Sequence, residues 1–414
     1  MSRRWVVVAL IFSGIVISYI DRGNLSIAAE SMMKDFGIPP ATMGVLLSAF
    51  FWSYAAFQIP AGAITDRIGI RRVYAAAFLL WSLASGAIAL SRGPTDIVLM
   101  RVLLGLGEAA GPIASLSFIR QNFSGSEQGL PTAIYIAGQN LGPALGALGG
   151  AIVVDRLGWR YLFAATGLGA LLWLPWWWWL APRGVTGTAD RPRSARRPWP
   201  WRLVMSNPAF WAVSLSIFLS SYFWYFVLTW VPAYLTMSRG FSTIEMGRVL
   251  STPLFIMAGL NIAAGSIADR LAARSGSVFR IRILFAATGY IFAAAILLLL
   301  VLPGRGVVFP ILLVSMCATG IGNTNYWAMS QHAPPPDMVG RTIGYLNTIS
   351  QIAGGMAPLI TGWILGPQKQ FGLAIGIAGV CSLLAAGCML FAGADGLERI
   401  KRSLASAAEP VASS

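Results

Sequence analysis

The chain has 414 residues, of which 56% are hydrophobic and only 11% are charged, and its formal net charge at pH 7 is +15. A soluble domain carries roughly 25% charged residues, so this composition excludes a globular protein whose whole surface faces water. Its apolar stretches repeatedly reach the ~20 residues that cross a hydrocarbon core. Such spans are helices, because backbone groups in lipid must be bonded internally.

In chain order, the apolar stretches predict twelve membrane-spanning helices. They cover residues 5–27, 42–64, 73–91, 96–119, 131–153, 160–181, 207–236, 244–266, 282–302, 307–330, 342–364 and 370–393. The predicted fold is an all-α integral membrane protein with two six-helix halves. We expect an N-terminal bundle over residues 1–182, a cytoplasmic linker over 183–206, a C-terminal bundle over 207–394 and a disordered cytoplasmic tail over 395–414.

Positive charge is divided unequally between the two sides of these spans. Roughly two thirds of the 30 Lys and Arg residues fall on the side that holds both termini, and this asymmetry predicts cytoplasmic termini in a bacterial inner membrane. The first span is too long for the apolar part of a cleavable signal. Because the arginines flank helices, we expect a lipid bilayer as the partner of this basic chain and no nucleic acid.

Four ionisable residues interrupt the predicted spans. Asp21 and Arg22 lie in the first, within SGIVISYIDRGNLSIAA, and Arg101 and Glu108 lie in the fourth, within RVLLGLGEAAGP. A charge at membrane depth costs several kcal/mol, so its presence favours a functional role. The alternative is a permanent ion-pair cluster that only joins two helices, but buried pairs contribute little net stability.

A charged turn between the second and third spans has a weaker copy later in the chain. Residues 62–72 read GAITDRIGIRR and residues 265–275 read GSIADRLAARS, which indicates two homologous halves. Gly62 would permit a close helix approach, Gly69 suits a tight turn, and Asp66 could bond to a helix terminus or pair with Arg72. The alternative is that Arg67, Arg71 and Arg72 only set the topology.

These motifs carry a resemblance to a known family. The first turn resembles the helix 2–3 loop signature of the major facilitator superfamily. The segments SYIDRGNLSIA, SAFFWSYAAFQIPAG, RVLLGLGEA and GWRYLF resemble its anion:cation symporter family, whose members carry sugar acids such as galactonate, glucarate and hexuronates. The resemblance, which extends to the D-galactonate:proton symporters, implies the major facilitator fold and a latch that stabilises the outward-open state. The latch residues would be Gly62, Asp66, Arg67, Gly69, Arg71, Arg72, Asp269 and Arg270.

The same resemblance implies roles inside the membrane. Asp21 and Glu108 would be the proton-linked acids, Arg22 would hold the substrate carboxylate, and Arg101 would partner the acids. The substrate-binding positions would be Tyr19, Arg22, Tyr54 and Gln139 in the first half and Thr324, Tyr326, Trp327 and Asn347 in the second. For each of the polar pocket positions an interhelical hydrogen bond is the alternative. The second half shows no clear intramembrane charge, and Tyr326 leaves an aromatic or smaller acid open as the substrate.

The chemistry of these residues predicts proton-coupled uptake of an organic monocarboxylate. An arriving anion would take Arg22, and an acid left without its arginine would favour protonation. Proton-driven efflux of an organic anion or drug, a non-transporting membrane sensor, and sodium as the coupling ion remain alternatives. We find no nucleophile–base pair, metal cluster or phosphate loop, so we expect a monomeric carrier that is not an enzyme and needs no cofactor or metal.

Overall fold

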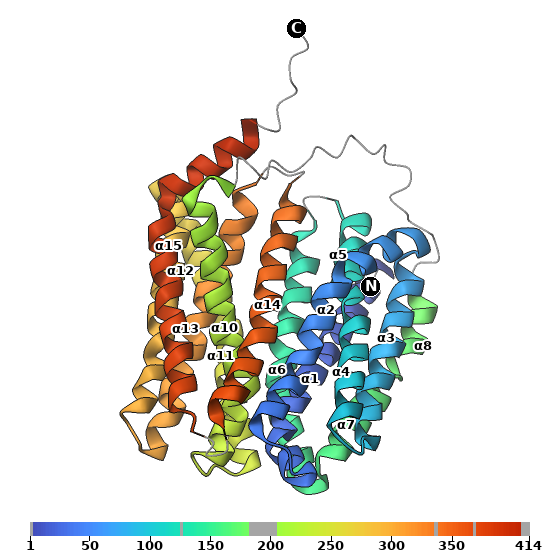
Figure 1. The fold of residues 1–414 in the computed structure, drawn as a ribbon. Helices are drawn as coiled ribbons and strands as arrows, with labels where there is room; N and C mark the ends of the chain where they lie inside the picture. The colour runs from blue at the N-terminus through green and yellow to red at the C-terminus, as the bar shows by residue number, and fades with distance from the viewer. Residues whose placement is uncertain (1–2, 125–126, 182–204, 335–337, 367–369, 407–414) are drawn as a thin grey trace. The chain divides into compact units, whose positions relative to one another are not determined.

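A computed structural model describes the chain except for residues 1–2, 125–126, 182–204, 335–337, 367–369 and 407–414. Most of the predicted linker and the end of the predicted tail therefore lie outside the described residues. The described ranges contain helices and turns and no strand (Figure 1). The predicted all-α class is confirmed.

The first six predicted spans correspond to helices with two internal breaks. They are α1 (Arg3–Phe36), α2 (Pro40–Ile68), α3 (Ile70–Ala87) with η1 (Ile88–Leu90), α4 (Pro94–Glu108) followed by α5 (Ala110–Asn122), α6 (Gly129–Leu157), and α7 (Trp159–Ala170) followed by α8 (Trp173–Leu180). Pro40 and Pro94 each stand in the first turn of their helix, where a missing N–H costs nothing.

The last six predicted spans correspond to helices in the same way. They are α10 (Pro208–Met237), α11 (Thr243–Ser275), α12 (Val278–Ala293) with η3 (Ala294–Leu300), η4 (Arg305–Val307) with α13 (Val308–His332), α14 (Val339–Leu365) and α15 (Gly372–Ser406). Within the described part of the chain, ten helices are long and apolar enough to cross a membrane. The segments α6 and α7–α8 are not among the ten. The break after Ala170 leaves α7 and α8 with 12 and 8 residues, each too short to span alone.

Close contacts divide the chain into two compact units. Unit 1 comprises Met1–Pro192, Phe226–Phe255 and Gly355–Phe371, and unit 2 comprises Arg193–Tyr225, Ile256–Gly354 and Gly372–Ser414. Within unit 1, α1 packs on α6 and α7, and α4 packs on α2 and α3. Within unit 2, α12 lies beside α13 and α15 (Figure 1). The helices of unit 1 bring together the segments that carry the four intramembrane charges.

Two turns in the first half share one sequence pattern. The pattern DR-x-G-x-R occurs at residues 66–71 and again at 155–160. Gly69 has φ 91° and ψ 151°, and Gly158 has φ 89° and ψ 166°, a region that is essentially restricted to glycine. The tight turn predicted at Gly69 is confirmed. Its recurrence three spans later fits a three-helix repeat inside the first half.

We expect Gly69→Ala and Gly158→Ala each to lower the free energy of unfolding by about 1–3 kcal/mol, because alanine is strained at these dihedral angles. Thermal denaturation of the purified protein in detergent measures the effect. Gly149→Ala is the matched control, since a Cβ at Gly149 would meet no atom within 4 Å and alanine is favoured in a helix. An unchanged melting temperature for Gly69→Ala would contradict the argument.

The second copy of the charged turn is folded differently. Ala272 stands where the first copy has Gly69, so the helix is not interrupted there, and α11 continues to Ser275. The turn follows at Gly276, whose φ is +68°. Asp269 therefore lies within a continuous helix.

The segment after Asp395 forms the end of α15, which corrects our expectation of a disordered tail for residues up to Ser406. Gly393, with φ 59° and ψ 161°, kinks the helix. Beyond the kink, Leu397, Ile400 and Leu404 are at most 7% exposed and belong to the core of unit 2. Their helical spacing is an amphipathic signal that the polar ending of the sequence obscured.

Candidate transport site

The central feature of unit 1 is an ion pair between α1 and α4. Arg22 Nε lies 2.5 Å from Glu108 Oε2, and the Ser18 hydroxyl donates a hydrogen bond of 2.8 Å to the same oxygen. The Glu108 side chain is 0% exposed, whereas the Arg22 side chain is 14% exposed. Glu108 is therefore sealed behind its arginine, and the arginine still reaches the surface of the unit.

Glycines in the segment RVLLGLGE bring α4 close to its neighbours. A Cβ at Gly105 would lie 2.5 Å from the Phe50 carbonyl oxygen on α2, and one at Gly107 would lie 3.0 Å from the Ala77 carbonyl oxygen on α3. Such small residues permit close helix packing. Glu108 ends α4, and α5 begins two residues later. The carboxylate is thus held at a break in the fourth span.

Three aromatic rings surround the Arg22 guanidinium. Its central carbon lies 4.5 Å from the ring centroid of Tyr19, 4.8 Å from that of Tyr54 and 5.1 Å from that of Phe50. A cation this close to a ring face is attracted by the ring quadrupole, more strongly when it is desolvated. The rings hold the plane of the guanidinium while only its Nε atom contacts Glu108. Among the described residues, no hydrogen bond is recorded for its Nη atoms.

Asp21 lies next to Arg22 in sequence but faces a different set of helices. Its Oδ1 atom accepts hydrogen bonds from Ser85 Oγ at 2.9 Å and Asn24 Nδ2 at 3.4 Å. The Asn24 amide also donates to Thr166 Oγ1 at 2.8 Å. Asp21 is 0% exposed, and no described arginine or lysine lies within ion-pair distance of it.

Arg101 is buried and lies against α2. It is 1% exposed, donates a weak hydrogen bond of 3.4 Å to the Leu47 carbonyl and lies 5.0 Å from the Phe50 ring centroid. Its Nε and Nη1 atoms have no hydrogen-bond partner among the described residues. The family resemblance implied Arg101 as the partner of the acids, whereas here Arg22 contacts Glu108. The partner role of Arg101 stays a prediction.

The predicted pocket residues fall into both units. In unit 1, Tyr19 and Tyr54 contact Arg22, and Gln139 donates a hydrogen bond of 3.2 Å to the Tyr135 hydroxyl. In unit 2, Tyr326 is fully buried, donates to the Val213 carbonyl at 3.3 Å and packs edge-on against Trp327. Thr324 and Asn347 are partly exposed on α13 and α14. Their roles as substrate ligands remain predictions.

Sequence reasoning missed a buried arginine in the second half. Arg282 on α12 is 7% exposed, forms an ion pair with Asp269 of α11 and donates a 2.8 Å hydrogen bond to Asn325 Oδ1. Its partner Asp269 has a side chain that is 70% exposed, so the expectation that the second half has no clear intramembrane charge stays a prediction. Arg280 and Arg282 open a helix and look like topology signals, because the sequence alone does not place α11 beside them.

The predicted latch residues are in different surroundings from those expected. A Cβ at Gly62 would lie 3.9 Å from Ile113 Cδ1, an ordinary contact, so no close approach of helices requires glycine there.

Arg71 donates a hydrogen bond to the Trp178 carbonyl, and its guanidinium stacks 4.3 Å from the Trp178 ring centroid. The remaining members Asp66, Arg67, Arg72 and Arg270 are exposed, and Asp66 forms no ion pair with any described residue. The latch remains a prediction.

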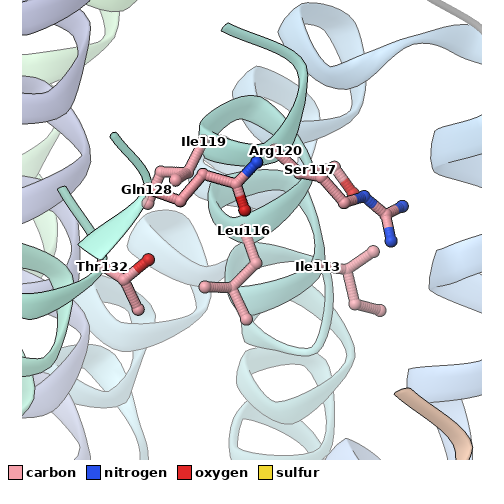
Figure 2. Close-up of a pocket in the computed structure, with 7 residues that line it drawn as sticks. All are labelled: Ile113, Leu116, Ser117, Ile119, Arg120, Gln128 and Thr132. Carbon is pink, nitrogen blue, oxygen red and sulfur yellow. The ribbon is translucent and has the colours of Figure 1, made fainter. Parts of the chain in front are cut away.

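A cavity of about 320 Å³ opens between α5 and the start of α6. Figure 2 shows its lining residues, namely Ile113, Leu116, Ser117, Ile119, Arg120, Gln128 and Thr132. None of these was predicted to bind substrate or protons. In the described part of the chain, no three His, Cys, Asp or Glu side chains are grouped as a metal cluster.

A bundle of long apolar helices that holds a buried arginine–glutamate pair defines a multi-pass membrane transporter. The chain belongs to the Major Facilitator Superfamily, whose profile matches residues 11–358. The predicted superfamily is thereby confirmed.

Two relatives extend this likeness. The chain is 28% identical over 382 residues to the probable anion transporter 4, chloroplastic, of Oryza sativa subsp. japonica. The match covers 88% of this chain and 64% of the rice protein, so the chain spans less than two thirds of that relative. It is 26% identical over 390 residues to the D-galactonate transporter of Escherichia coli O6:H1, covering 87% and 89% of the two chains. The predicted likeness to galactonate carriers is confirmed.

A solved structure gives the same fold. The inward-facing, unoccupied crystal structure of a bacterial homologue of the human lysosomal transporter Spinster matches with a TM-score of 0.73. The match covers 100% of both chains at 18% sequence identity. At that identity the comparison supports the fold alone.

Proposed function

We propose that this protein imports an organic monocarboxylate, such as a sugar acid, together with protons by alternating access. Arg22 binds the substrate carboxylate, and Glu108 binds the coupled proton. The observation that carries the proposal is the Arg22–Glu108 pair. The guanidinium contacts Glu108 through Nε at 2.5 Å and remains 14% exposed.

The coupling follows from an exchange of partners. An arriving carboxylate accepts hydrogen bonds from the Arg22 Nη atoms, a charge-assisted and planar interaction that suits arginine. Once the substrate shares Arg22, less of the positive charge of the guanidinium compensates the negative charge of Glu108. The Glu108 side chain is 0% exposed, so water does not replace the lost interaction. A buried carboxylate without a cation favours its neutral form, so the substrate and a proton load together.

The unequal distribution of positive charge supports a cytoplasmic location of both termini, and the likeness to an Escherichia coli transporter supports a bacterial inner membrane. The likeness to the D-galactonate transporter supports a sugar acid as the substrate, and import is part of the proposal. A growth test separates the directions. If the protein is an importer, deletion of its gene should abolish growth on the substrate as carbon source. If it is an exporter, the deletion should instead make the cells more sensitive to the toxicity of the substrate.

Uptake into proteoliposomes tests the proposal directly. We expect an inward proton gradient to drive accumulation of at least one monocarboxylate from a panel of galactonate, gluconate, glucuronate and benzoate, in buffers free of sodium. Adding a protonophore should remove the accumulation, because the gradient is its driving force. If no panel acid accumulates and none exchanges in counterflow, the proposed function is wrong.

A further inference from the structure

The cavity between α5 and the start of α6 takes no part in the exchange of partners between Arg22 and Glu108. Its volume is about 320 Å³, which lies at the lower end of the range of small-molecule pockets, about 300–1,000 Å³. All of its lining residues belong to unit 1. The cavity therefore has room for one small molecule within this unit.

The lining of the cavity combines apolar and polar side chains. In Figure 2, Leu116 and Ile113 lie toward one end of the cavity. Ser117, Arg120 and Gln128 lie toward the other end, where α5 finishes and α6 begins. The lining therefore suits a ligand that has a polar or charged group at one end and carbon atoms at the other.

Most polar groups of the lining are hydrogen-bond donors that have no acceptor. Arg120 is exposed and forms no ion pair or hydrogen bond with another described residue. Within the described ranges, no hydrogen bond is recorded for the hydroxyls of Ser117 and Thr132. Gln128 donates one N–H to the Phe123 carbonyl at 3.1 Å and has a second N–H to offer. A guanidinium and neutral donors around one cavity favour an anionic ligand.

The positive charge at the cavity is not balanced by a carboxylate. The described lining contains no Asp or Glu. The nearest acid in sequence is Glu127, and both of its oxygen atoms accept hydrogen bonds of 3.1 Å from Arg4. Glu127 is thus already paired, and Arg120 keeps its charge for a ligand. A free guanidinium suits a carboxylate, which it can bind through two parallel hydrogen bonds.

The ion pair between Arg4 and Glu127 also indicates on which side of the membrane the cavity lies. Arg4 stands in the first turn of α1, beside the N-terminus. The end of α5 and the start of α6 therefore lie on the same side as the N-terminus, which we expect to be cytoplasmic.

The cavity continues from the proposed transport site along two helices of unit 1. Arg120 lies 12 residues beyond Glu108, about 18 Å along the span at 1.5 Å per residue. On α6, Thr132 lies seven residues before Gln139, so both residues share one face of the helix. The cavity thus lies between the proposed transport site and the cytoplasmic end of unit 1.

We infer that this cavity is a second binding site for the carboxylate of the transported acid, which occupies it on the way to the cytoplasm. Arg120 pairs with the carboxylate, and the hydroxyls of Ser117 and Thr132 bond to polar groups of the acid. The inference rests on the proposed function and deepens it, because it gives the anion a site after it leaves Arg22. Water screens the exposed Arg120 more than it screens Arg22, so binding here is weaker, as release requires.

A cysteine placed in the cavity tests its preference for anions. Ser117→Cys is introduced into the full chain after Cys317, Cys381 and Cys388 are replaced by alanine, and the protein is purified in a neutral detergent. Its rate of modification by carboxyethyl methanethiosulfonate, an anion, is compared with the rate for trimethylammonioethyl methanethiosulfonate, a cation. Adding Arg120→Gln should lower the ratio of the anionic to the cationic rate about 10-fold, because the guanidinium attracts one reagent and repels the other.

Two further arginine variants show whether charge is the cause. Arg120→Lys keeps the charge and should retain most of the ratio. Arg92→Gln is the matched control, because Arg92 is also exposed in unit 1 but precedes α4, at the opposite end of the fourth span. It should leave the ratio unchanged. Thr132→Cys, across the cavity on α6, replaces Ser117→Cys as the reporter if that variant does not fold.

Protection from modification identifies the anion. An excess of at least one acid among galactonate, gluconate, glucuronate and benzoate should slow the modification of Ser117→Cys several-fold, whereas galactitol, which lacks a carboxylate, should not. The inference is overturned if Arg120→Gln does not change the ratio of rates, or if none of the acids protects. Protection by phosphatidylglycerol alone would assign the cavity to a lipid headgroup instead. These rates are measured without a proton gradient, so a failure of this site is distinguished from a failure of proton-driven uptake.

Discussion

Replacing Arg22 by lysine is expected to reduce substrate uptake by about 100-fold, equivalent to about 2.7 kcal/mol. Lysine keeps the positive charge but presents a single nitrogen, so it cannot contact Glu108 with one atom and the substrate with others. It also loses the planar contact with the rings of Tyr19, Tyr54 and Phe50. Initial rates of proton-driven uptake across a range of substrate concentrations should show the loss mainly as a raised KM.

The matched control for this change is Arg160→Lys. The Arg160 guanidinium also stacks on an aromatic ring, 4.2 Å from the Trp159 centroid, and pairs with Asp35 at 3.4 Å. Its side chain is 47% exposed, where such pairs contribute little, so uptake should stay within about twofold. If Arg22→Lys transports with an unchanged KM, the guanidinium does not bind the substrate carboxylate.

Hydropathy predicted the twelve spans because span length and apolar composition are local properties of the sequence. It did not predict the breaks after Glu108 and Ala170, although Pro112 and Pro175 follow them within five residues. Each proline lacks the N–H that would bond to the carbonyl four residues earlier, at Glu108 and Leu171. Local chemistry predicted the turn at Gly69 from its glycine, and the same reasoning explains why α11 passes through Ala272 without stopping. The end of α15 was missed because a polar composition hid three apolar residues at helical spacing.

The partners of the charged residues depend on how each helix is rotated, which the sequence does not fix. Asp21 and Arg22 are neighbours, but consecutive residues on a helix point about 100° apart. Asp21 therefore contacts Ser85 of α3, and Arg22 contacts Glu108 at the end of α4. The sequence predicted that the four charges matter. The family resemblance implied Arg101 as the partner of the acids, and that role stays a prediction.

Replacing Glu108 by glutamine is expected to separate substrate binding from proton transport. Glutamine has the shape of the protonated acid but cannot release a proton. The rate of counterflow exchange should therefore stay within a few-fold of that of the unaltered protein, while accumulation of substrate on an inward proton gradient should disappear.

The unaltered protein should bind substrate more weakly as pH rises, because deprotonated Glu108 competes with the substrate carboxylate for Arg22. The variant should show a flat dependence on pH.

Glu127→Gln is the control that makes this result specific. Glu127 is an exposed carboxylate outside the spans, and the hydrogen bond from Arg4 holds its pKa below the usual range. It is therefore ionised throughout the pH range in which transport is assayed, and its replacement should leave both accumulation and its pH dependence unchanged. Glu108 differs because its carboxylate is sealed from water and shares one guanidinium with the proposed substrate. If Glu108→Gln still accumulates substrate on a proton gradient, the coupled proton is carried elsewhere in the protein.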